Sequence, residues 1–135
     1  MKIFHFITKQ TKINTELLKA PRKLTDKEFK EIQRHTIIGY TILKNCKFGS
    51  PEIKVAALQH HERIDGSGYP KKITRIDKVA QFLGFVDCYE ALTNDDRPYR
   101  TAMDPFNALV LIKKDVEAKK FDRNIFETFT KCLAQ

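Results

Sequence analysis

The sequence predicts an all-α protein: one domain over residues 1–135, built as a bundle of about five to six helices. Apolar residues recur at spacings of three and four along most of the chain, which is typical of amphipathic helices. No segment alternates apolar and polar residues for long enough to predict a strand, and residues that favour helix N-caps occur frequently. A chain of 135 residues, 41% of them hydrophobic, is long enough to bury one core.

The first half of the chain predicts two helices. Thr25 followed by Glu28 is a capping box and begins a helix over residues 25–44. Its inner face is an apolar stripe of Phe29, Ile32, Thr36, Gly39 and Leu43. Ser50 and Pro51 supply an N-cap and a first-turn proline for a second helix that runs to about His61. Before residue 25, the sequence suggests only a short helix around residues 13–18.

The second half begins with a loop, since residues 65–70 contain two glycines and a proline. A helix over residues 77–93 follows, and we expect it to be the central buried helix. Its apolar positions are Val79, Phe82, Leu83, Val86, Tyr89 and Leu92. Asp104, which precedes Pro105, and Asp122 predict the N-caps of two further helices.

Charge and cysteine content limit the class of protein. The chain carries 25 basic and 17 acidic residues, a net charge of +8, which favours an anionic partner such as a nucleotide, a nucleic acid or an acidic protein surface. A basic surface without a dedicated partner explains the same excess. The three cysteines are widely spaced and odd in number, as expected for reduced thiols in the cytoplasm. No apolar run approaches the ~20 residues of a membrane span, and the first residues do not resemble a signal peptide.

The candidate chemistry lies in the histidines and one aspartate. His60 and His61 are adjacent at the predicted end of a helix, His35 lies on the preceding helix, and Asp87 interrupts the most apolar helix. Such residues on three successive helices are how bundle-core metal sites are built, and adjacent histidines suit two neighbouring metals. The alternative is a chance histidine pair together with an aspartate that is paired to a lysine.

The run from Gln59 to Pro70, Gln-His-His-Glu-Arg-Ile-Asp-Gly-Ser-Gly-Tyr-Pro, closely resembles the motif of the HD-GYP family, a branch of the HD-domain metal-dependent phosphohydrolases. The stretches Lys23–Thr25, Arg34–His35, Asp87–Thr93 and Arg97–Arg100 extend the similarity over roughly residues 5–130. The resemblance implies a helical HD-domain-like bundle with two or three metal ions, most often iron or manganese. It also implies hydrolysis of cyclic-di-GMP, a bacterial signalling nucleotide, to linear pGpG or GMP.

Site roles follow from the resemblance, position by position. It implies metal ligation by His5, His35, His60, His61 and Asp87, and stabilisation of phosphoryl charge by Lys9. It implies nucleotide and phosphate contacts for Tyr69, Arg97 and Arg100. Glu62 and Asp65 are candidates to orient the ligand residues by hydrogen bonds without touching the metal themselves. Four of these residues also have an alternative role that is not tied to catalysis. The arginines could be solvated surface charges, Tyr69 could anchor the loop or contact a partner protein, and Glu62 could pair with a basic residue.

The chain departs from the family at the His-Asp pair that gives the family its name. His5 and Lys9 match, but Phe6 stands in place of the aspartate that bridges metals, and phenylalanine has no donor atom. We also expect the domain to lack the helices that precede this pair in the family. We therefore expect a cyclic-di-GMP phosphodiesterase domain with impaired turnover, or alternatively an inactive nucleotide-binding or protein-interaction module. Exposed apolar surface would favour a homodimer, and a protein partner would use the Gly-Tyr-Pro loop. Non-specific nucleic-acid binding is the weakest hypothesis.

Overall fold

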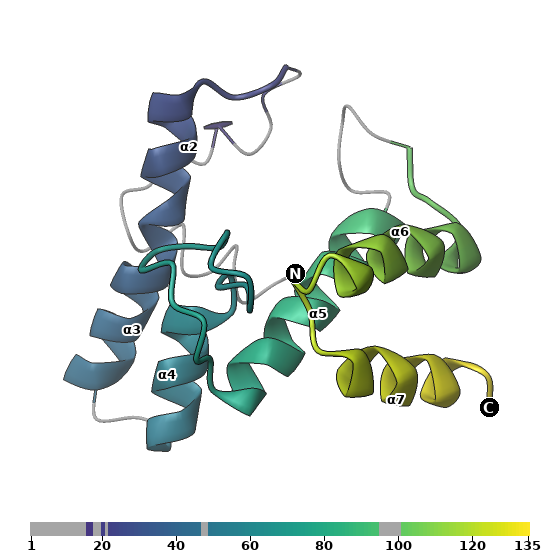
Figure 1. Cartoon of the computed structure of the whole chain (residues 1–135). Helices are drawn as coiled ribbons and strands as arrows, with labels where there is room; N and C mark the ends of the chain where they lie inside the picture. The colour runs from purple at the N-terminus through teal and green to yellow at the C-terminus, as the bar shows by residue number, and fades with distance from the viewer. Residues whose placement is uncertain (1–15, 18–19, 21, 47–48, 95–100) are drawn as a thin grey trace.

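The computed structural model describes residues 16–17, 20, 22–46, 49–94 and 101–135, and within these ranges every regular element except one short turn is an α-helix. The helices are α2 (Asp26–Gln33), α3 (His35–Asn45), α4 (Pro51–Gln59), α5 (Lys78–Thr93), α6 (Pro105–Glu117) and α7 (Arg123–Leu133). The all-α prediction is confirmed. Helices α2, α3 and α4 lie on one side of α5, and α6 and α7 lie on the other (Figure 1).

The predicted helix starts agree with the structure, and all but one of them carry a side-chain cap; Ser50 is the N-cap residue of α4 but makes no side-chain cap hydrogen bond, and Pro51 opens that helix. Thr25 and Glu28 form the complete capping box, and the Asp77 carboxylate accepts from the Val79 backbone N–H at the start of α5. Asp104 and Asp122 cap α6 and α7 in the same way. These caps fix where each helix begins, and therefore which residues fall on its inner face.

The predicted helix over residues 25–44 is interrupted at Arg34. The Arg34 backbone N–H bonds to the carbonyls of Glu31 and Ile32, so the last turn of α2 tightens before α3 starts at His35. The His35 side chain also occupies the Ile32 carbonyl, at 2.7 Å from Nδ1. The break places His35 at the first turn of α3 with its ring directed inward.

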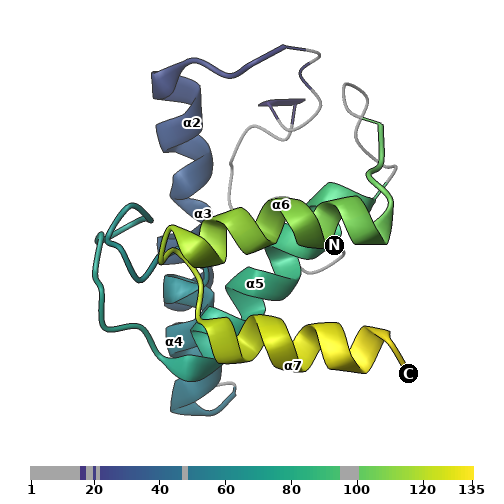
Figure 2. The same ribbon diagram turned by 45° about the vertical axis from the view of Figure 1, so that its right-hand side comes forward.

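Among the described residues, most of the buried apolar side chains form two clusters around α5. Phe85 and Leu92 pack against α6 and α7 together with Ala108, Ile112, Val116 and Phe121. Ala80 packs on the other side with Ala56 and Ile76. Helix α5 is the central helix, as expected, and buries Ala80, Gly84, Phe85 and Leu92, but it is not buried on every side, because Val79, Phe82 and Leu83 are between 37% and 51% exposed. Figure 2 shows α6 and α7 roughly parallel to each other, with α5 crossing behind them.

Candidate metal centre

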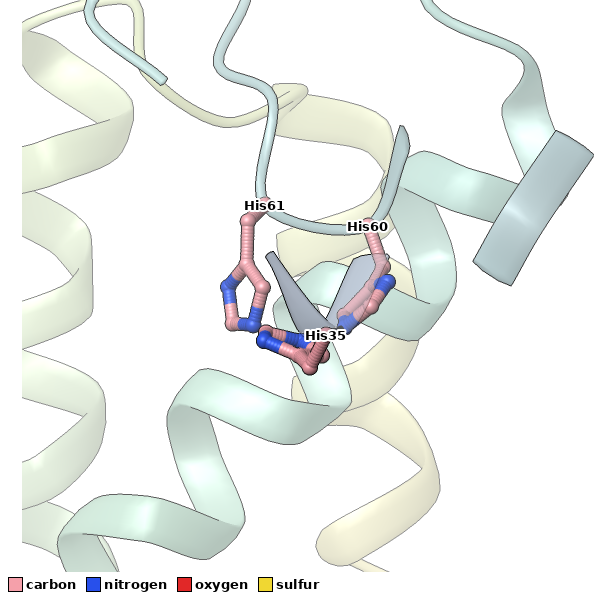
Figure 3. A group of neighbouring side chains, drawn as sticks. All are labelled: His35, His60 and His61. Atoms are coloured by element: carbon pink, nitrogen blue, oxygen red, sulfur yellow. Dashed lines mark hydrogen bonds between the residues drawn. The ribbon is translucent and has the colours of Figure 1, made fainter. Parts of the chain in front are cut away.

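Three histidines converge where α3, the end of α4 and the following turn meet (Figure 3). His35 comes from the first turn of α3, His60 is the C-cap residue of α4, and His61 follows in the turn. Ligand nitrogens of the three rings all lie within 4.8 Å of one another. His35 and His60 are 3% and 7% exposed, so the group is largely shielded from solvent.

The hydrogen bonds of two of these histidines determine their tautomers. Nδ1 of His35 lies 2.7 Å from the Ile32 carbonyl, and Nδ1 of His60 lies 3.0 Å from the Ala57 carbonyl. A carbonyl oxygen only accepts, so each Nδ1 carries the proton and each Nε2 of a neutral ring presents a lone pair. The two Nε2 atoms face each other at 3.2 Å.

Two facing lone pairs repel each other unless a cation or a proton lies between them. Protonation is disfavoured, because burial lowers the pKa of His35 to about 4 and lowers the pKa values of His60 and His61. Metal–nitrogen bonds of 2.0–2.1 Å place two ligand nitrogens about 2.9–3.4 Å apart, and the observed separation of 3.2 Å falls in this range. The donor set therefore fits a divalent metal ion.

Asp87 supplies the negative charge beside the histidines. It lies on α5, and its Oδ2 atom is 3.9 Å from Nε2 of His61. Because burial keeps His61 neutral, this contact is a carboxylate next to a neutral imidazole and not an ion pair. A carboxylate beside three neutral imidazoles is a ligand combination that divalent first-row metals bind.

The Gly-Tyr-Pro segment closes over the histidines. The Tyr69 ring stacks on His61 with centroids 4.6 Å apart and an interplanar angle of 23°, and its backbone N–H donates to the His61 carbonyl. The Glu62 carboxylate is buried and accepts from the backbone N–H groups of Lys71 at 2.7 Å and Ile73 at 3.1 Å. Glu62 thus holds the loop, and its hydrogen bonds go neither to a histidine nor to a basic side chain.

The remaining candidate residues fall elsewhere. Asp65 is exposed and accepts from the backbone and hydroxyl groups of Ser67, which stabilises the turn and not a ligand. His5, Phe6, Lys9, Arg97 and Arg100 lie outside the described residues. The structure thus brings together His35, His60, His61, Asp87, Tyr69 and Glu62.

Arg63 and Gly84 shape the site, although the sequence analysis did not single them out. Arg63 donates to the carbonyls of His60 and Glu62, and its guanidinium group lies 4.5 Å above the Phe121 ring. A Cβ atom at Gly84 would lie 2.0 Å from the His60 carbonyl oxygen, so only glycine lets α5 pass this close. A glycine inside a helical pattern is the one signal that points to such an approach.

Comparison with known proteins places this geometry in context. Residues 11–125 match the family of HD domains. The chain is 37% identical over 120 residues to a cyclic di-GMP phosphodiesterase of Pseudomonas aeruginosa. The aligned residues are 87% of this chain and 28% of the relative. It is 34% identical over 119 residues to a 3′3′-cGAMP-specific phosphodiesterase of Vibrio cholerae, covering 86% of this chain and 27% of the relative.

A third relative is a cyclic di-GMP phosphodiesterase response regulator of Xanthomonas campestris, 37% identical over 93 residues, which are 67% of this chain and 24% of the relative. The chain thus spans between 24% and 28% of the length of these three curated relatives. In the part of the chain that the structure describes, no helix has the length and apolar character needed to cross a membrane.

Proposed function

Because this chain belongs to the HD domain family, with relatives of the type expected from the HD-GYP resemblance, we propose that it holds divalent metal ions and acts on a cyclic dinucleotide. The observation that carries the proposal is the pair of Nε2 atoms that face each other at 3.2 Å with their lone pairs converging. His35, His60, His61 and Asp87 would hold the metal, and His5 is a further proposed ligand. Iron and manganese are the metals we propose.

A bound divalent metal polarises phosphoryl oxygens and lowers the pKa of water, which is the chemistry that phosphodiester hydrolysis requires. The chain's own residues prepare the site for it. Burial keeps the imidazoles neutral and available as ligands, and the Asp87 carboxylate supplies negative charge. Tyr69 covers His61 and limits access of water from that side. Lys9, Arg97 and Arg100 are the proposed contacts for the phosphates.

Phe6 favours a second candidate function. A phenylalanine cannot ligate a metal, so we propose impaired turnover, and the alternative is a module that binds a cyclic dinucleotide or a protein partner without hydrolysing it. A protein partner would contact the loop that contains Gly68, Tyr69 and Pro70. The two candidates share the fold and the histidines and differ in metal occupancy and turnover.

Metal stoichiometry tests the proposal first. The protein is purified without oxygen from medium supplemented with iron and manganese, and its metals are measured by elemental analysis. We expect at least one metal ion per chain and its loss in His60→Asn, with no loss in Glu52→Gln, an exposed position on the same helix. Metal in the wild type followed by cleavage of cyclic-di-GMP supports the enzyme, and metal with binding but no cleavage supports the module. Absence of metal from the wild type overturns the metal site.

A further inference from the structure

Phe29 departs from the burial pattern of its own helix. The spacing of apolar residues places Phe29 on the same face of α2 as Ile32, which is 8% exposed. Phe29 itself is 46% exposed. A large aromatic ring on the inner face of a helix is thus left open to solvent, and the core does not account for it.

The exposed ring lies beside the metal centre. Its centroid is 5.9 Å from that of Tyr69, at an interplanar angle of 79°. Tyr69 in turn stacks on His61 at 4.6 Å and lies 6.4 Å from His35. Figure 1 shows α2, which carries Phe29, on the same side of α5 as the connection between α4 and α5 that carries Tyr69. Only the Tyr69 ring therefore separates Phe29 from His61 along this chain of aromatic contacts.

This arrangement matches the shape of the proposed substrate. A cyclic dinucleotide carries planar purine bases attached to a ring of sugars and phosphates, so a base must lie next to the site when a phosphodiester is at the histidines. Aromatic side chains bind bases by stacking, and this interaction tolerates different bases because each has a π face. The edge-on contact with Tyr69 fixes the Phe29 ring while 46% of the residue stays accessible.

We propose that Phe29 is a substrate-binding residue that stacks on one purine base of the cyclic dinucleotide. This inference rests on the proposed function for the class of substrate. Phe29 has no polar side-chain atom, so it would add affinity for a purine without distinguishing guanine from adenine. Discrimination between these bases would come from other residues.

The test compares two ligands that differ only in the base. Dissociation constants for GMP and for ribose 5-phosphate are measured by calorimetry on manganese-loaded protein, for the wild type, Phe29→Leu, Phe29→Trp and Phe106→Leu. Phe106 is the matched control, because it is 72% exposed and lies on α6. We expect Phe29→Leu to weaken GMP binding about 5- to 100-fold and to leave ribose 5-phosphate unchanged. Phe29→Trp is expected to retain GMP binding, and Phe106→Leu to change neither ligand.

Several outcomes would overturn the inference. These are equal loss of both ligands in Phe29→Leu, no loss of either, or a wild type that binds GMP no more tightly than ribose 5-phosphate. Loss of GMP binding with an altered metal content also counts against it, because the effect would then come from the metal centre. Cleavage of cyclic-di-GMP is assayed separately, so base stacking can be confirmed even if the wild type does not hydrolyse the substrate.

Discussion

At the scale of single residues, the protonation of His35 couples the metal centre to folding. Burial disfavours the charged imidazole and lowers the pKa of His35 from 6.5 to about 4, and the same effect acts on His60 and His61. Neutral imidazoles are the form that binds metal. Each of these histidines therefore takes up a proton more readily in the unfolded chain than in the folded one.

The metal-free protein is therefore expected to lose stability as the pH falls from about 6.5 towards 4. Above pH 6.5 the histidines are neutral in both the folded and the unfolded chain, so they do not change the free energy of unfolding. Between pH 6.5 and about 4 the unfolded chain binds these protons more readily than the folded chain does, which favours unfolding. We expect the free energy of unfolding to fall by a few kcal/mol over this window, at about 1.4 kcal/mol per unit of pKa shift. Urea denaturation in EDTA at pH 7.5 and 5.0 measures the effect, and His35→Gln should flatten the pH dependence. A wild type equally stable at both values would contradict the expectation.

A second prediction at the level of one residue concerns the effect of Phe6 on metal content. Restoring a carboxylate with Phe6→Asp should raise the metal content, because the aspartate at this place in the family motif bridges metals. Elemental analysis after loading with manganese measures the change, and Phe4→Asp, two residues away, provides a control for added negative charge. An unchanged metal content in Phe6→Asp would show that His5 and Phe6 do not occupy the His-Asp position.

At the scale of elements, the connection between α4 and α5 covers the histidines, and the buried carboxylate of Glu62 holds this connection in its conformation. Glu62 is 3% exposed and binds two backbone N–H groups nine and eleven residues further along the chain. Tyr69, whose ring covers His61, lies in the stretch of chain between Glu62 and Lys71 that these hydrogen bonds close. The loop is thus closed by side-chain to backbone bonds and by the close approach at Gly68, where a Cβ atom would lie 2.4 Å from the His61 carbonyl oxygen.

Glu62→Gln should therefore destabilise the fold by about 1–3 kcal/mol, because an amide NH₂ group would face a backbone N–H that now has an acceptor. Urea denaturation measures the loss, with Glu127→Gln, at an exposed position on α7, as the control. The same variant should loosen the Tyr69 segment, which hydrogen exchange at residues 66–73 would report. Equal stability of the two variants would mean that the carboxylate does not hold the loop.

The elements also show which parts of the fold could be predicted from the sequence. Helix starts were predictable at Thr25, Asp104 and Asp122, because a cap depends on neighbours within three residues. The break at Arg34 was not, since it depends on a tightened last turn and on the His35 ring binding the Ile32 carbonyl. Periodicity alone treats such a break as continuous helix.

At the scale of the whole molecule, the candidate site was predicted as a set of residues but not as a geometry. The convergence of His35, His60 and His61 follows from histidines on successive helices, and the family motif supplied their roles. The hydrogen bonds that fix the two tautomers are local contacts with Ile32 and Ala57, but the facing of the Nε2 atoms depends on how α3 packs against α4, which no spacing reveals. The exposure of Phe82 was likewise unpredictable, because it depends on which helices cover α5.

That exposed surface leads to a prediction about assembly. Val79, Phe82 and Leu83 lie at helical spacing on α5 and are 48%, 51% and 37% exposed, next to a shallow apolar groove that also involves Ile125 and Thr128 of α7. Exposed apolar side chains that cluster in this way favour association with another protein surface. The net charge of +8 opposes self-association at low salt, because two copies repel each other.

We therefore expect a dimer in solution at ~100 μM and moderate salt, with a mass near twice the 15.7 kDa of the chain. Light scattering coupled to gel filtration measures the mass, and raising the salt concentration should strengthen the association by screening the repulsion. Phe82→Lys should return the protein to a monomer, because it places a charge in the apolar cluster of α5, whereas Lys54→Glu on α4 should leave the dimer in place or strengthen it by lowering the net charge. A wild type that stays monomeric across this range would show that α5 does not mediate self-association.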